Sequence, residues 1–231
     1  MTKKEYIDKV LVVMNESRAE GSAVFTGADT AQVDQYIEDT YIDAWRRCAA
    51  IVPRGWLKKN YLFLTASEEE PDDGSRSIHV ANLENGTGYV LLPPDFYMFY
   101  SFKMSGWKKV VYEALEENEQ VTSIQGNEYT RGSEIRPVCT LSSMLSGGDN
   151  RYVLRYYSLR PLLTEHKVDR DYCLYIPATE ALPASDNQML TGITDRMAEP
   201  MAYVHASIVY TLFEKPDTAA LLYQKALEMC G

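Results

Sequence analysis

The spacing of apolar residues changes twice along this chain of 231 residues, and that change constrains its fold more than any other feature. Apolar residues first recur every three or four positions, which predicts helices over 3–18 and 29–52. From about residue 61 the spacing is that of strands, and after residue 185 it returns to that of helices. Helices, then strands, then helices predict an α+β fold rather than an alternating α/β fold.

The first two predicted helices have clear ends and clear apolar faces. Thr2 and Glu5 form a capping box at the start of the first, and Pro53 and Gly55 end the second. Their apolar residues are Tyr6, Val10, Val13 and Met14 in the first helix, and Val33, Ile37, Tyr41, Trp45, Cys48 and Val52 in the second. Stripes of this kind predict helices that bury one face against a common core.

The middle of the chain reads as short strands joined by turns. Asn85-Gly86 lies between two apolar runs, 78–80 and 89–91, and predicts a hairpin. Pro93-Pro94-Asp95 predicts a turn in which the carboxylate acts as a turn-capping group. Further strands are predicted over 96–103, 107–115, 137–141, 151–159 and 171–176.

Helix signals return in the last quarter of the chain. Ser185 to Gln188 form a second capping box that predicts the start of a helix, and Asp217 or Thr218 is predicted to cap the last helix. The predicted inner face of that last helix is Leu221, Leu222, Tyr223, Ala226 and Leu227. The predicted architecture is therefore a helical bundle made of residues 1–60 and 185–231, with residues 61–184 inserted as an antiparallel β domain.

Composition excludes some classes of protein. Acidic residues outnumber basic ones by 33 to 23, for a net charge of −10, which disfavours tight nucleic-acid binding across a broad surface. No stretch approaches the roughly 20 apolar residues of a membrane helix. The cysteines at 48, 139, 173 and 230 contain no CxxC pair, so we expect free thiols in a reducing cytoplasm.

The candidate catalytic motifs are incomplete. Ser105 and Lys108 fit Ser-x-x-Lys, and Ser185-Asp186-Asn187 fits Ser-Asp-Asn, but the Lys-Thr-Gly that accompanies both in penicillin-recognising enzymes is absent. The histidines at 79, 166 and 205 have no partner at metal-ligand spacing. We expect His205 to be a hydrogen-bonded residue of the core or of its boundary, and we expect no catalytic, metal or cofactor site.

One cluster of charge carries a functional hypothesis. Five basic residues gather between Trp45 and Tyr61, namely Arg46, Arg47, Arg54, Lys58 and Lys59. In an acidic protein, such a basic cluster is typical of a contact with a negatively charged partner. The alternative is a solvated helix end, where the helix dipole favours cations.

Several short sequence motifs, taken in order, resemble those of one family of proteins. They are Ala44-Trp45, the run Leu92-Pro93-Pro94-Asp95-Phe96 with Gly106-Trp107 after it, residues 125–132 closing on Arg136-Pro137-Val138, the run 156–161, and a closing helix pair that ends in Ala226-Leu227-Glu228. This order is similar to the head-to-tail adaptor, or connector ring, proteins of tailed bacteriophages, and above all to the ring proteins of crAss-like phages. The resemblance spans most of the chain.

The resemblance implies a virion structural protein and not an enzyme. Such proteins form rings, commonly of twelve copies, below the portal protein, where they extend the DNA channel and receive the tail. DNA would pass through without specific binding, and channel acids would repel it. The candidates for such acids are Glu68, Glu69, Glu70, Asp72 and Asp73. The alternatives are a phage tail or capsid accessory protein and, from another class, a small cytoplasmic enzyme.

Overall fold

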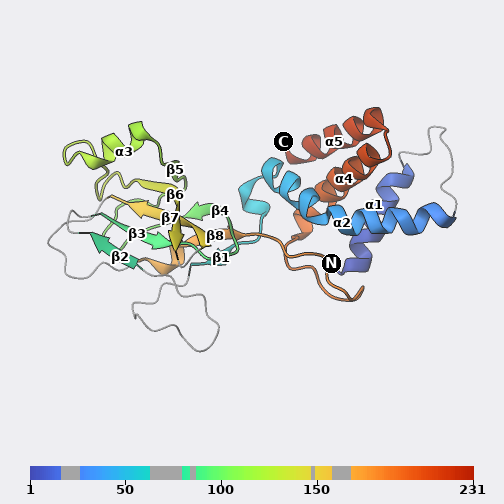
Figure 1. Ribbon diagram of the computed structural model, residues 1–231, viewed down its shortest axis with the longest axis horizontal. Coiled ribbons are helices and arrows are strands. Elements are labelled where there is room, and N and C mark those ends of the chain that lie inside the picture. The colour runs from blue at the N-terminus through green and yellow to red at the C-terminus, as the bar shows by residue number, and fades with distance from the viewer. Residues whose placement is uncertain (17–26, 63–79, 84–86, 147–148, 158–167) are drawn as a thin grey trace. The chain divides into compact units, whose positions relative to one another are not determined.

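The computed structural model describes residues 1–16, 27–62, 80–83, 87–146, 149–157 and 168–231 (Figure 1). They divide into two compact units. The helical unit contains Met1–Lys58 and Thr179–Gly231, and the β unit contains Lys59–Ala178. The fold is α+β, with helices at both ends of the sequence. The unit boundaries fall at 58/59 and 178/179, where the sequence predicted 60/61 and 184/185.

The helical unit is organised around one helix from the end of the chain. Its helices are α1 (Lys3–Glu16), α2 (Gly27–Ile51), α4 (Asp195–Leu212) and α5 (Pro216–Cys230), with a short 3₁₀ helix, η1, at Arg54–Trp56. α4 packs against α1, α2 and α5. Because it has neighbours on several sides, α4 is apolar nearly all round, and even Pro200, His205 and Ser207 on it are buried.

The N-terminal half of the helical unit matches the sequence prediction. In the capping box, the Thr2 amide donates to Glu5 Oε2 at 2.8 Å and the Glu5 amide donates to Thr2 Oγ1 at 3.2 Å. The predicted stripes of α1 and α2 are buried throughout, from Tyr6 in α1 to Val52 after α2. These two helices are therefore held by apolar faces that the sequence already displays.

The C-terminal half departs from the prediction in three places. No helix starts at Ser185: the Gln188 amide closes a turn onto the Ser185 carbonyl, and α4 begins ten residues later. Pro216, and not Asp217 or Thr218, opens α5, where proline loses no helical hydrogen bond. The inner face of α5 is Ala219, Leu222 and Ala226, and two of these three side chains are small, which lets α5 lie close to α4. Leu221, predicted on that face, is 65% exposed.

The β unit contains two sheets. The smaller has the order β1 (Asn60–Tyr61), β8 (Leu174–Pro177), β4 (Phe96–Ser101) and is antiparallel. The larger has the order β2 (Val80–Leu83), β3 (Thr87–Leu91), β7 (Asp149–Tyr156), β6 (Cys139–Ser146), β5 (Leu115–Glu116). Its β5–β6 pair is parallel, so the predicted antiparallel domain is mixed at this one edge.

Both sheets contribute to one core. Phe99 and Tyr175 come from the smaller sheet, and Val90, Leu154 and Tyr156 from the larger. The predicted hairpin is confirmed by the antiparallel pairing of β2 with β3, although its turn, 84–86, lies outside the described residues. Gly88 is required in β3, because a Cβ there would collide with the Tyr156 ring.

The segment between β4 and β6 was predicted least well. Residues 107–110 form no strand, because Trp107 turns inward to pack edge-on against Phe102, with ring centroids 5.8 Å apart. A helix the sequence did not predict, α3 (Glu119–Gly126), follows β5. Asn118 caps it by accepting a hydrogen bond from the Val121 amide at 2.9 Å. Short η2 (Arg170–Tyr172) precedes β8.

Candidate interaction surfaces

The two serines considered for catalysis belong to different units. Ser105 is exposed in a turn beside Gly106, whose φ of +92° suits glycine, and Ser185 lies in the other unit. Within the described ranges, no group of three or more His, Cys, Asp or Glu side chains could hold a metal ion. The four cysteines are unbonded to one another, and burial raises the pKa of Cys48 to about 12 and that of Cys173 to about 11.

Asp95 acts within the fold. The Phe96 amide donates to the Pro93 carbonyl at 2.9 Å, which closes the predicted turn. Both carboxylate oxygens of Asp95 are within reach of the Tyr175 hydroxyl, at 3.1 and 3.2 Å. The hydrogen bond between this carboxylate and Tyr175 therefore connects the turn to β8.

His205 is a hydrogen-bonded core residue, one of the two positions predicted for it, and it bridges two helices. It is fully buried and joins α1 to α2, with Nδ1 2.6 Å from the Tyr6 hydroxyl and Nε2 2.9 Å from Thr40 Oγ1. Thr40 donates its own proton to the Tyr36 carbonyl, so Nε2 carries the imidazole proton and Nδ1 accepts from Tyr6. Burial lowers the pKa of His205 to about 3, against a smaller raising effect of the Ile37 backbone. His79 and His166 lie outside the described residues.

Four of the five residues of the basic cluster are exposed, and the cluster spans the boundary between the two units. Arg46 and Arg47 lie near the end of α2, Arg54 in η1 and Lys58 just beyond, all on the helical unit and all exposed. Lys59 belongs to the β unit, where its ammonium lies 4.2 Å from the centre of the Tyr100 ring. The candidate channel acids, Glu68, Glu69, Glu70, Asp72 and Asp73, all lie outside the described residues.

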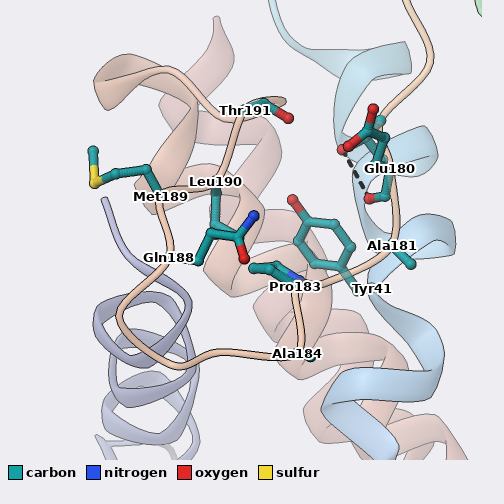
Figure 2. Close-up of a pocket in the computed structure, with 10 residues that line it drawn as sticks. Tyr41, Glu180, Ala181, Pro183, Ala184, Gln188, Met189, Leu190 and Thr191 are labelled. Carbon is teal, nitrogen blue, oxygen red and sulfur yellow. Dashed lines mark hydrogen bonds between the residues drawn. The ribbon is translucent and has the colours of Figure 1, made fainter.

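A pocket of about 250 Å³ lies beside α2 in the helical unit (Figure 2). Tyr41 contributes from α2, and the other lining residues come from the segment 179–194, here called the pocket loop. Figure 2 shows Tyr41, Pro183 and Gln188 gathered around the hollow, whereas Met189 points away from it. The sequence did not reveal this pocket, because its wall is a loop and the sequence predicted a helix over part of that loop.

Backbone hydrogen bonds hold the pocket loop in place from two directions. The Lys3 amide donates to the Gln188 carbonyl and the Lys4 amide to the Asp186 carbonyl, each at 3.0 Å. From α2, Trp45 Nε1 donates to the Gly192 carbonyl at 2.9 Å. Thr194 Oγ1 also donates to the Trp56 carbonyl. The pocket is therefore preformed, which lowers the entropic cost of filling it.

The β unit presents a tyrosine on an equally fixed loop. Tyr129 is 94% exposed, and we call residues 126–132 the tyrosine loop. Asn127 holds it twice, since its side chain accepts from the Tyr129 amide and its carbonyl from the Arg131 amide, both at 2.9 Å. The buried Gln125 side chain accepts from the Gly132 amide at 2.9 Å. The Asn127 side chain two residues before Tyr129 was the available sequence signal for this turn.

Comparison of the sequence with protein families and curated proteins identifies no relative. No protein-family model matches the chain, and no curated protein matches it in sequence. None of the helices in the described residues is both long and apolar enough to cross a membrane.

Proposed function

We propose that this chain is a virion structural protein, a subunit of the head-to-tail adaptor ring that lies below the portal of a tailed bacteriophage. In this role it extends the DNA channel, joins capsid to tail and performs no catalysis. The helices form the ring wall, the β unit meets the neighbouring ring or tail, and one terminus docks on the portal.

The observation that carries the proposal is the position, within the fold, of the sequence motifs that resemble adaptor proteins. Ala44 and Trp45 are both buried, and Trp45 fixes the pocket loop. Asp95 fastens the turn into β4, and Trp107 packs in the core of the β unit. Three of the motifs that resemble adaptor proteins thus contain buried or hydrogen-bonded residues of the two units.

The charge of the chain fits passage of DNA without capture. A net charge of −10 repels a phosphate backbone, so a genome could slide past a surface of this sign. The basic cluster supplies local positive charge for a protein partner, and its position at the end of α2 exposes four of its five members. The partners we propose are further copies of this chain, the portal, and the adjoining ring or tail protein.

Electron microscopy of the chain mixed with portal from the same phage tests the proposal. We expect a collar of density on one end of the portal, with the symmetry of a ring. A portal from an unrelated phage is the control, because a collar on both would mean non-specific adhesion. Bare cognate portals under saturating protein would reject the adaptor role, and binding to capsids or tails in the same assay would then favour an accessory protein.

A further inference from the structure

We infer that residues 112–129, here called the acidic segment, dock against another protein whose contact surface combines apolar side chains with Lys or Arg. The surface lies entirely within the β unit. The inference deepens the proposed function, and it rests on that function in one respect, that the partner is sought in the neighbouring ring or tail protein.

The helix at the centre of the acidic segment has little packing of its own. α3 lies at the margin of the β unit (Figure 1), and it packs closely against no other helix or strand that the structure describes. Gln125 is its one buried residue, whereas its apolar residues Val121 and Ile124 are half-buried and 42% exposed. An eight-residue helix is marginal in water without packing. Because Val121 and Ile124 are three residues apart, they form one apolar face that a partner can cover.

Large apolar side chains around α3 extend this uncovered surface. Leu115 of β5 is 43% exposed, and Tyr112 and Tyr129, before and after it, are more exposed still. The tyrosine loop is joined to α3, since Thr130 Oγ1 donates to the Ile124 carbonyl at 2.7 Å. Exposed apolar side chains that gather among polar residues are typical of a protein–protein contact.

The charge of the acidic segment specifies the chemistry of the partner. The segment has no Lys or Arg, and its acidic residues are Glu113, Glu116, Glu117, Glu119 and Glu128. Arg155 of β7 pairs with Glu117 at 3.6 Å, whereas the other four are exposed and form no ion pair within the described residues. The bases adjoining the segment in sequence are the exposed Lys109 and the half-buried Arg131. A partner with Lys or Arg beside its apolar contacts complements the four unpaired carboxylates.

The same charge disfavours the other classes of occupant. Nucleic acid and anionic lipid are negatively charged and would be repelled by these carboxylates. A second copy of the chain carries a net charge of −10, so copies that approach one another also repel. A different protein with a basic, apolar surface is the occupant that remains.

Hydrogen exchange of the full chain with a model peptide tests the surface. The probe is an amphipathic helical peptide of Leu and Lys, and its matched control has Glu in place of Lys. We expect the Leu-Lys peptide to slow exchange of the α3 amides roughly tenfold or more, because binding stabilises a helix that is marginal alone. The Leu-Glu peptide should leave exchange unchanged. An α3 that gains no protection, or gains it from both peptides, overturns the inference.

Charge variants locate the binding site of the same peptide. Glu113→Lys with Glu116→Lys leaves α3 itself intact, and we expect it to raise the Kd of the Leu-Lys peptide roughly tenfold. Glu180→Lys with Glu228→Lys is the matched control, because it changes the net charge equally at exposed positions of the helical unit. It should change the Kd less than about twofold. Equal weakening by both pairs would mean that the peptide responds only to overall charge, and would overturn the inference.

Carboxylate-to-amine crosslinking identifies the native contact. In purified phage particles, a carbodiimide joins a Glu carboxylate to a touching Lys amine through an amide bond, and takes up the water released. We expect products that join residues 113–128 to Lys of a different protein of the particle. Products that join this segment only to Lys of the same chain or of a second copy overturn the inference, as does the absence of any product from it.

The two proposals fail separately. A collar on the portal, with no protection of α3 by the Leu-Lys peptide, would reject this surface and keep the adaptor role. Protection of α3 together with bare portals would keep the surface and reject the adaptor role.

Discussion

His205 is a buried residue on which three helices depend. It lies on α4, accepts a hydrogen bond from the Tyr6 hydroxyl of α1, and donates one to the Thr40 hydroxyl of α2. Tyr6 is itself fully buried, and burial raises its pKa well above the usual value, so the hydroxyl remains a donor at ordinary pH. The Thr40 hydroxyl in turn donates to the Tyr36 carbonyl, so the chain of hydrogen bonds ends on the α2 backbone.

Removing one hydroxyl should expose that dependence. Tyr6→Phe leaves His205 Nδ1 buried without a donor, so we expect the free energy of unfolding to fall by about 1–3 kcal/mol. Urea unfolding followed by circular dichroism measures it. Tyr223→Phe on α5 is the matched control and should change stability by less than about 0.5 kcal/mol. Equal losses in both variants would contradict the role of the His205 bridge.

The same residue predicts acid sensitivity. The pKa of His205 is lowered to about 3 in the folded chain from an ordinary 6.5, so the unfolded state binds the extra proton between these values. Stability is therefore fully present above pH 6.5 and falls as the pH drops toward 3. Asp34 acts in the opposite direction, since burial, then Glu38 and Asp8, raise its pKa.

Comparing wild type with His205→Gln isolates the histidine from that opposing effect. Between pH 6 and 4, the pH-dependence of unfolding free energy should be shallower in the variant by up to one proton, about 1.4 kcal/mol per pH unit. Parallel pH profiles would mean that His205 is protonated at an ordinary pKa.

At the scale of elements, the pocket loop matters because it links the chain's N-terminus, α2 and α4. Its close approach to α2 requires Gly192, where a Cβ would meet the Thr179 side chain and lie 3.3 Å from Trp45 Nε1. Lys3 adds to this fastening from the N-terminus, with Nζ 2.7 Å from Glu38 and 3.8 Å from Asp186.

Gly192→Ala should force the loop away from α2. We expect a loss of about 1–3 kcal/mol from overpacking, together with faster hydrogen exchange at the Trp45 indole N–H. Gly55→Ala in η1 is the control, because nothing lies within 4 Å of a Cβ built there. An unchanged indole exchange rate would show that the loop accommodates the methyl group without moving.

Elements with a stripe were predictable from sequence, and elements defined by distant contacts were not. Val33, Ile37 and Tyr41 mark the face of α2 because local spacing alone determines which residues share a side. Ser185 has the form of a helix cap, but the backbone near it pairs with Lys3 and Lys4, more than 180 residues away in sequence. No local pattern could reveal that pairing.

The candidate surfaces divide in the same way. The basic cluster was visible as a run of like charge, although Lys59 proved to belong to the β unit. The pocket and the tyrosine loop were not visible in the sequence, since hydrogen bonds between side chains and backbone hold each of them, as between Gln125 and Gly132. Such contacts leave no periodicity in the sequence.

At the scale of the whole molecule, the β unit is an insertion with adjacent ends. β1 and β8, its first and last strands, pair directly, with Asn60 opposite Tyr175. Paired residues in antiparallel strands lie only about 5 Å apart. Each unit also has a core of its own. The core of the β unit lies around Phe102, and the core of the helical unit lies around α4.

These adjacent ends predict that the helical unit survives loss of the insertion. Replacing residues 59–178 with a short Gly-Ser linker should leave a cooperatively unfolding helical protein, because the linker has little distance to span. Circular dichroism and urea titration measure this, with the isolated 59–178 fragment as the companion protein. A broad, non-cooperative transition would show that the helical unit needs the β unit to fold.

The central place of α4 also sets an order of events during synthesis. α1 and α2 leave the ribosome first, but the helix that covers both begins only at Asp195. The β unit, complete by Ala178, is free to fold before that helix exists, since domains fold as units as they emerge. Until α4 emerges, the apolar faces of α1 and α2 lack the helix that covers them, and the growing chain is then most exposed to aggregation.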